Sequence, residues 1–167
     1  RQMCIRDSGY MASAVPGTVY GLLEAHERFG QLPLEKVLQP VIDQARNGII
    51  VSYDLHNAIG SSYQLMDDPE SRKIYFQDNK PVAIGSVMKR PDLANTFEAI
   101  AKEGKDGFYS GWVAERIQSS MAKNGGFIDA NDLNKYISKF RDPIGVNYRG
   151  YSVSVSYTHL RAHETSI

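Results

Sequence analysis

The sequence predicts a mainly α-helical fold with a few strands near its C-terminal end. From about residue 18 to residue 133, apolar residues recur three or four positions apart, as on one face of a helix. After Tyr136 the pattern turns to alternating and β-branched residues, which favours strands. Of the 167 residues, 42% are hydrophobic and 23% are charged, close to the average of folded globular proteins. No repeat or Pro/Ser-rich linker divides the sequence, so we expect one domain or one piece of a domain.

The first two helices are expected on either side of Gly30. Apolar residues at helical spacing predict a helix from Thr18 to Phe29, which Gly30 should close by adopting the left-handed conformation. The pattern resumes after Pro33 and predicts a second helix from Leu34 to Asn47. Pro40 lies inside this helix and should bend it, because proline has no N–H to donate to the helix.

A third helix and a short extended region follow. Ser52 can cap a helix that carries apolar residues at 55, 59 and 63 and that must be over by Asp68 and Pro69. The run Ile74 to Ile84 places aromatic and β-branched residues on both sides of a polar stretch. This pattern favours a small hairpin or an extended loop.

Two longer helices are expected in the next part of the chain. Pro91 suits the first position of a helix, and Gly104 should stop that helix. Ser110 can cap the following helix, which should end at Asn124 and the two glycines after it.

A short sixth helix and the terminal strands complete the expected elements. Asp129 should open the helix, with Asp132 at its third position and Ile128 placed to pack on Leu133 as a hydrophobic staple. Beyond Tyr136 the strands should be interrupted at residues 143 and 150, a proline and a glycine.

The charge balance restricts the partners of this chain. Lysine and arginine number 19, as do aspartate and glutamate, so the formal net charge is zero. Because no basic field exists to attract polyanions, we expect neither nucleic acid nor an anionic membrane as a partner. No apolar run approaches the roughly 18 residues that a membrane span needs, and the opening residues lack a signal-peptide pattern. We therefore expect no membrane span in this chain.

Both ends of the sequence can be back-translated into one sequencing adapter. Residues 1–8 can be encoded by a strand containing CAG ATG TGT ATA AGA GAC AG, and residues 154–167 by one containing CT GTC TCT TAT ACA CAT CT. The second string is the reverse complement of most of the first, as expected of a DNA insert flanked by the same adapter. We therefore expect residues 1–8 and 154–167 to be non-native and residues 9–153 to be the native segment. Cys4, His159 and His163 then leave the inventory of functional residues.

Metal and nucleophile sites are not expected in the native segment. Its only histidines, His26 and His56, stand thirty positions apart and no cysteine accompanies them, which excludes a His/Cys metal cluster and a Cys/His nucleophile pair. No Gly-x-Ser-x-Gly elbow is present to activate a serine. We interpret His26 as a helix-face residue at the core boundary and His56 as a solvated one.

Three further patterns resemble functional sites only in part. The glycines of residues 104–111 have neither a dinucleotide-binding nor a phosphate-loop spacing, and the acidic residues after Ile128 lack the glycine and the final glutamate of a calcium loop. The acidic pairs are interpreted as solvated helix faces; they are Glu24 with Glu27, Asp67 with Asp68, and Glu98 with Glu103. Trp112, with Phe108 and Tyr109 upstream, could line a pocket, although packing in a core or an interface is favoured.

Several stretches taken together resemble the γ-glutamyltranspeptidase family. Their common order and spacing over almost the whole native segment make the match specific, whereas each stretch alone is weak. The sequence departs from the family at Ser13 and Ala14, near where the family usually has glycine before Val/Thr-Pro-Gly-Thr. The stretches are Ala14 to Gly30, Leu32 to Ile42, Asp92 to Thr96, Gly107 to Gly111, Lys123 to Leu133 and Tyr148 to Tyr151.

The resemblance implies an α/β N-terminal-nucleophile hydrolase fold, with two stacked sheets between helical layers. It implies a precursor that cleaves itself into a large and a small subunit, whose new N-terminal threonine takes the γ-glutamyl group from glutathione and passes it to an amino acid, a peptide or water. It also suggests a periplasmic or extracellular enzyme that needs no cofactor. The match covers the middle to later part of the large subunit, so we expect an inactive fragment whose partners are the rest of that subunit, the small subunit and γ-glutamyl substrates.

No catalytic, cofactor-binding or metal-binding residue of the family maps onto this sequence, so none is expected here. Two alternatives stay open: a related cephalosporin-acylase-like amidase and a non-catalytic helical binding module. If the sheets of the fold lie elsewhere, the helices should leave a contiguous apolar face exposed. The residues expected on that face are Val19, Leu23, Val37, Val41, Phe97, Ile117 and Met121.

Overall fold

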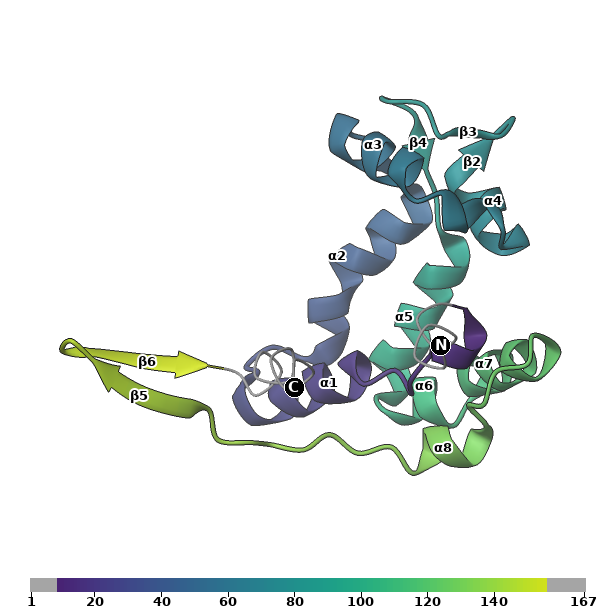
Figure 1. The fold of residues 1–167 in the computed structure, drawn as a ribbon. Helices are drawn as coiled ribbons and strands as arrows, with labels where there is room; N and C mark the ends of the chain where they lie inside the picture. The colour runs from purple at the N-terminus through teal and green to yellow at the C-terminus, as the bar shows by residue number, and fades with distance from the viewer. Residues whose placement is uncertain (1–8, 156–167) are drawn as a thin grey trace, which may run out of the picture. The chain divides into compact units, whose positions relative to one another are not determined.

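The computed structural model describes residues 9–155 and divides the chain into two units, residues 1–136 and residues 137–167 (Figure 1). The first unit is a set of helices with two very short antiparallel ladders, and the second contains a single β-hairpin. The mainly helical prediction is therefore confirmed, and strands also occur within the helical part. Among the described residues, no helix has both the length and the apolar character needed to cross a membrane.

The first two helices lie where the sequence predicts them. Helix α1 spans Thr18–Phe29 and α2 spans Leu34–Asn47 with Pro40 inside it, after the short 3-10 helix η2 at Tyr10–Ala12. The predicted role of Gly30 is wrong, because its φ of −71° is not left-handed. A glycine is needed there for another reason: a Cβ would collide with the carbonyl oxygen and the ring of His26.

The third helix is shorter than predicted, and a fourth was not expected. Helix α3 spans Tyr53–Ser61, and the Oγ of Ser52 accepts a hydrogen bond from the Leu55 N–H at 3.1 Å, as predicted for its cap. The chain then forms the 3-10 helix η3 at Tyr63–Met66. Helix α4 follows at Pro69–Tyr75, so residues 74 and 75 are helical instead of extended.

The short strands pair within the first unit. β2 at Phe76–Gln77 pairs with β3 at Lys80–Pro81, which confirms a small hairpin between residues 74 and 84. Its two turn residues both have positive φ, as tight hairpin turns require. β1 at Ile49–Ile50 pairs with β4 at Val87–Met88, and this ladder joins the chain after α2 to the chain before α5.

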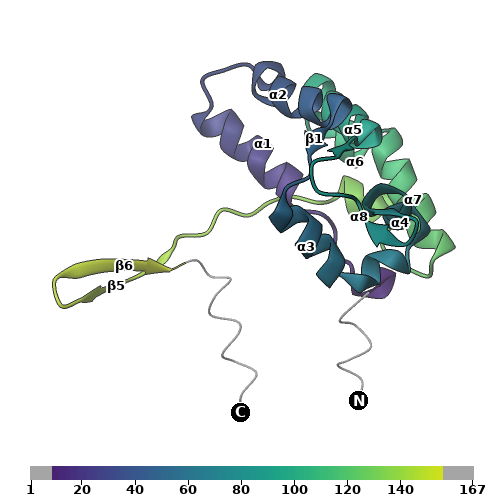
Figure 2. The same ribbon diagram turned by 90° about the horizontal axis from the view of Figure 1, so that it is seen from above.

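Helices α5, α6 and α7 follow. α5 spans Pro91–Glu103 and packs beside α2 (Figures 1 and 2), with Pro91 at its start and Gly104 after its end as predicted. α6, at Asp106–Tyr109, was not predicted. α7 spans Trp112–Lys123, but the predicted cap at Ser110 is wrong: Gly111 is the N-cap, and the Ser110 hydroxyl donates to the Asn134 side chain at 2.9 Å.

Helix α8, at Ala130–Asn134, confirms the predicted capping arrangement. The Asp129 side chain accepts from the Asp132 N–H at 2.8 Å, and the Asp132 side chain accepts from the Asp129 N–H at 3.2 Å. Ile128 and Leu133 are both buried in one apolar cluster, as the staple requires. The capping box therefore defines the start of α8.

A buried apolar cluster of the first unit lies where α1, α6, α7 and α8 meet, and further buried side chains, such as Val51 and Ile59, lie outside it. Leu133 is fully buried in this cluster together with residues from α6, α7 and the loop before α8. Half-buried side chains from α1 pack against this cluster. The buried members of this cluster are Tyr109, Ala114, Ile128 and Leu133.

The second unit is a hairpin without buried side chains in its described part. β5 at Ile144–Tyr148 pairs with β6 at Tyr151–Val155 through a turn in which Arg149 and Gly150 have positive φ, consistent with the predicted break at residue 150. The last residues of β6, at 154 and 155, belong to the stretch that the sequence assigns to an adapter and pair with residues 145 and 144. Residues 1–8 and 156–167, including Cys4, Ile5, Tyr157 and Leu160, lie outside the described residues.

Candidate functional site

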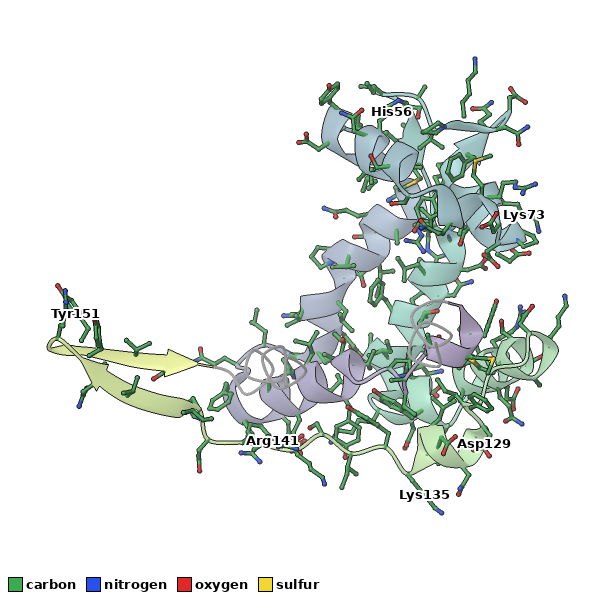
Figure 3. The ribbon with its side chains drawn as sticks, in the orientation of Figure 1. His56, Lys73, Asp129, Lys135, Arg141 and Tyr151 are labelled. Carbon is green, nitrogen blue, oxygen red and sulfur yellow. The ribbon has the colours of Figure 1, made fainter. Side chains whose placement is uncertain are left out.

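The side chains of both described histidines hydrogen-bond to backbone carbonyl oxygens. The ring Nε2 of His26 lies 2.9 Å from the carbonyl oxygen of Leu32, and Nδ1 of His56 lies 2.8 Å from that of Val82. Since a carbonyl oxygen can only accept, each nitrogen is the donor. His26 is half-buried, consistent with its predicted place, but His56 is also half-buried where a solvated residue was predicted. Figure 3 shows His56 on α3, well apart from Asp129 at the start of α8.

Several carboxylates of the acidic pairs and of the segment after Ile128 cap helices or form ion pairs. Asp68 accepts a hydrogen bond from the Ser71 N–H at 2.8 Å at the start of α4, and this bond lowers the pKa of its carboxyl group. Glu98 pairs with Arg46, and Glu27 lies 3.9 Å from Lys105. Asp129 and Asp132 form the capping box of α8 and not a calcium loop. Within residues 9–155, no group of three or more His, Cys, Asp or Glu side chains is placed to hold a metal ion.

The aromatic residues near Trp112 divide between core and surface. Tyr109 is buried, its hydroxyl donates to the Pro16 carbonyl at 2.5 Å, and it accepts from the Tyr20 N–H at 3.1 Å. Burial raises the pKa of Tyr109, because the phenolate would lose its hydration. Its ring stacks on that of Tyr136 with 5.8 Å between centroids. Trp112, in contrast, keeps 44% of its surface exposed.

The glycine-rich stretch around α6 lacks the context of a nucleotide-binding loop, and one of its glycines has a packing role. It follows a helix, α5, and not a strand, so the strand–loop–helix context of nucleotide binding is missing. A Cβ on Gly107 would collide with the backbone of Ala99, so glycine lets α6 approach α5 closely. The same holds for Gly17, where a Cβ would collide with the hydroxyl of Tyr136.

Two grooves lie over α5. The larger, about 730 Å³, runs between α5 and α7 and mixes acidic and basic side chains with Trp112. The smaller, about 260 Å³, lies between α1, α2 and α5 and is almost wholly apolar. It contains several side chains predicted for an exposed apolar face: Val37 is 44% exposed, while Val19, Leu23 and Phe97 are half-buried. Ile117 and Met121, also predicted for that face, pack with Val19 against the cluster around Leu133, so the prediction of one contiguous exposed face is wrong for these residues.

Neither described histidine is placed to activate a hydroxyl group. Between residues 9 and 155, neither histidine forms a hydrogen bond with a serine, a threonine or a carboxylate. A serine or threonine that relies on a histidine base needs that histidine within hydrogen-bond reach. The distinctive feature of this part of the protein is therefore its close helix packing and its apolar groove.

Comparison with known proteins gives consistent matches. A sequence profile of the family described as Gamma-glutamyltranspeptidase matches residues 1–158. The glutathione hydrolase proenzyme of Escherichia coli is 38% identical over 148 residues, which are 87% of this chain and 26% of that protein. Acylase ACY 1 proenzyme of a Pseudomonas species, strain SE83, is 40% identical over 146 residues, again 87% of this chain and 26% of that protein.

The structure gives a similar result. The crystal structure of Helicobacter pylori gamma-glutamyltranspeptidase superposes with a TM-score of 0.84 at 34% sequence identity, covering 89% of this chain and 43% of that chain. The chain thus spans about a quarter of the length of the curated relatives that it matches.

Proposed function

This chain belongs to the gamma-glutamyltranspeptidase family, and we propose that the protein to which it contributes is a γ-glutamyltransferase and glutathione hydrolase. The fold is that of the N-terminal-nucleophile hydrolases, and the described helices form part of it. The observation that carries the proposal is the alignment of 87% of this chain with a protein named glutathione hydrolase proenzyme.

The proposed reaction is an acyl transfer in two steps. In the first, a threonine at the N-terminus of a small subunit attacks the γ-carbonyl carbon of glutathione, the amide C–N bond breaks, and cysteinylglycine leaves with the transferred proton on its amine. In the second, the amine of an amino acid or peptide, or a water molecule, attacks the ester and restores the threonine. The threonine's own α-amine can act as the base, as in other enzymes with an N-terminal threonine.

The described helices have a structural role in this proposal. Both described histidines hydrogen-bond to backbone carbonyls, and the helices carry an uncovered apolar groove between α1, α2 and α5. The proposed partners are the rest of the large subunit and the small subunit of the same proenzyme. The exposed leucine and phenylalanine on α1, Leu22 at 66% and Phe29 at 76%, are apolar surfaces that such partners would cover.

The proposal is tested by comparing this chain with the proenzyme obtained by extending its gene at both ends. We expect the proenzyme to cleave itself into two pieces and to release aniline from a γ-glutamyl anilide, and the 167-residue chain to release none. Replacing the threonine at the new N-terminus by alanine should abolish both cleavage and anilide hydrolysis. A proenzyme that neither cleaves itself nor hydrolyses the anilide would overturn the proposal.

The related acylase remains a second candidate because ACY 1 proenzyme matches this chain at 40% identity. The gamma-glutamyltranspeptidase function is preferred, since both the family profile and the H. pylori structure carry that description. Assaying the same proenzyme with a γ-glutamyl anilide and with the side-chain amide of a cephalosporin separates the two. Hydrolysis of the cephalosporin amide alone would favour the acylase.

We also propose that residues 9–153 are the native segment and that residues 1–8 and 154–167 are translated adapter. The support is the back-translation of both ends into complementary strings. The family profile, which matches residues 1–158, includes some of these positions. Sequencing the source DNA across both junctions tests the proposal, and a continuous native reading frame without adapter at either junction would disprove it.

A further inference from the structure

A separate cavity lies where α2 meets the short elements that precede α5. It measures about 300 Å³ and is lined by side chains from α2, β1, α3, α4, β4 and the start of α5. Val41, Met88 and Leu93 contribute apolar walls, and Gln44 contributes an amide. The charged residue in this lining is Arg90, which stands immediately before α5.

Arg90 is held in place without a counter-charge. Its backbone N–H donates to the Ala45 carbonyl at 2.8 Å, which anchors the residue to α2. Its guanidinium carbon lies 5.5 Å from the centre of the Tyr75 ring, in a cation–π contact. Its Nε is buried and has no hydrogen-bond partner, and Arg90 takes part in none of the ion pairs formed within the described part of the chain.

Arg46, near the end of α2, shows the more usual arrangement, in which an arginine pairs with a carboxylate. Its guanidinium is exposed and pairs with Glu98 and Asn95. Arg90 is half-buried yet lacks such a partner. A half-buried cation without an ion-pair partner carries a desolvation cost that an anion in the cavity can offset.

The shape and chemistry of the cavity favour one class of anion. A guanidinium presents parallel N–H donors that match the two oxygens of a carboxylate. Apolar walls favour a ligand with an apolar body over a small, strongly hydrated ion such as phosphate. A volume of about 300 Å³ lies at the lower end of small-molecule sites, so the ligand must be small.

We propose that this cavity is a binding site for a small organic carboxylate, with Arg90 holding the carboxylate and the apolar walls holding its body. The site needs only residues between 41 and 93, and it is independent of the γ-glutamyl transfer proposed above. Failure of either proposal leaves the other untouched.

Benzoate is the probe, titrated into the 167-residue chain and followed by isothermal titration and by amide chemical shifts. We expect millimolar or tighter binding, with shifts concentrated at residues 41–55 and 75–93. Benzamide, which has the same shape without the charge, and inorganic phosphate, which has the charge without the apolar body, should each bind at least about tenfold more weakly. Equal binding of benzoate and benzamide, or no binding of benzoate, would overturn the proposal.

The matched variants are Arg90→Gln and Lys89→Gln, which remove the same charge from neighbouring positions. Lys89 is exposed and does not line the cavity, so K89Q should bind benzoate as the parent chain does. R90Q should bind at least about tenfold more weakly, because it loses the charged donor pair. Undiminished binding by R90Q, or an equal loss in both variants, contradicts the proposed role of Arg90.

A stability measurement distinguishes a ligand-binding arginine from a structural one. Since Arg90 has no counter-charge in the described residues, Arg90→Met should leave the urea midpoint unchanged or raise it. If R90M and R90Q fail to fold, Arg90 is a structural residue and its assignment to the ligand is wrong. The comparison of benzoate with benzamide on the parent chain then decides whether a carboxylate site exists at all.

Discussion

The helical unit and the terminal hairpin differ in how many of their side chains are buried. The helical unit has a closed apolar cluster in which Leu133 is fully buried and Tyr109 keeps 4% of its surface exposed. In the hairpin, every described side chain from Ile144 to Ser154 is exposed. Backbone pairing and a tight turn define the hairpin, whereas side-chain packing defines the helical unit.

The hairpin nevertheless has the sequence of a strand pair with one apolar face. Its register places Val146 opposite Val153 and Tyr148 opposite Tyr151, so apolar side chains share one face, while Asn147 and the serines alternate with them. An isolated two-stranded ribbon is marginally stable in water. The comparison shows that the alternation of apolar and polar residues is sufficient to specify the strands. A stable hairpin also requires a second layer that packs on its apolar face.

The largest contrast is expected for Leu133→Ala. Removing a fully buried leucine side chain leaves a cavity in the cluster, so the free energy of unfolding should fall by about 2–5 kcal/mol. Leu22→Ala is the matched control, because Leu22 is 66% exposed and should change stability by less than about 0.5 kcal/mol. Urea unfolding measures both. Equal losses would show that the cluster around Leu133 is not part of the core of the unit.

A smaller loss is expected for Tyr109→Phe. The change keeps the ring but leaves the Pro16 carbonyl and the Tyr20 N–H without their hydroxyl partner, which should cost about 1–3 kcal/mol. Tyr151→Phe removes a hydroxyl from a side chain that is 75% exposed and should be nearly neutral. The same urea series tests the pair, and a neutral Y109F would mean that the two hydrogen bonds add nothing to stability.

Tyr109 also predicts the direction of an alkaline effect. Burial raises its pKa in the folded chain, so on raising the pH the unfolded chain ionises at this residue first. Its contribution is therefore fully present below the ordinary tyrosine pKa of about 10 and is lost as the pH rises through the folded value. Unfolding free energies measured on both sides of that pH should fall less in Y109F than in the parent chain. An identical fall in both would exclude Tyr109 as a source.

Loss of the α8 cap should lower the free energy of unfolding by less than the two core substitutions do. Asp129→Ala removes the acceptor for the Asp132 N–H and should destabilise the helical unit by about 1 kcal/mol. Asp142→Ala, an exposed aspartate outside the helices, is the matched control and should lie within about 0.5 kcal/mol of the parent. Thermal unfolding compares them, and similar melting temperatures for D129A and D142A would contradict a stabilising capping box.

The smallest effect is expected in the hairpin. Val146 is 60% exposed, so Val146→Ala should change the global free energy of unfolding by less than about 0.5 kcal/mol. In hydrogen exchange, hairpin amides should exchange faster than those of α7, because exposed pairs open without unfolding a core. A V146A loss that approaches that of L133A would remove the distinction between the two units.

Local signals in the sequence determined most helix ends. Ser52 and Asp129 cap α3 and α8 through hydrogen bonds to the residue three positions ahead, and Pro91 starts α5. Such contacts involve neighbours in the chain, so the pattern of a few residues is sufficient to predict them. The terminal hairpin was predictable for the same reason, since alternation and a glycine turn are local.

Other outcomes depended on tertiary contacts. Gly30 and Gly107 are needed because His26 and the backbone of Ala99 approach them, and Ser110 hydrogen-bonds to Asn134 on α8 instead of capping α7. The short helices α4 and α6 have too few residues for a periodic pattern to be visible.

The functional features also divide into those that the sequence predicts and those that depend on tertiary contacts. The motifs of residues 14–151 were sufficient to recognise the family, because their order and spacing are properties of the chain itself. The positions of His56 beside the Val82 carbonyl and of Arg90 beside Tyr75 were not predictable. Each joins residues from different elements, and only the packing of α2, α3, α4 and α5 decides which side chains meet and which charge lacks a partner.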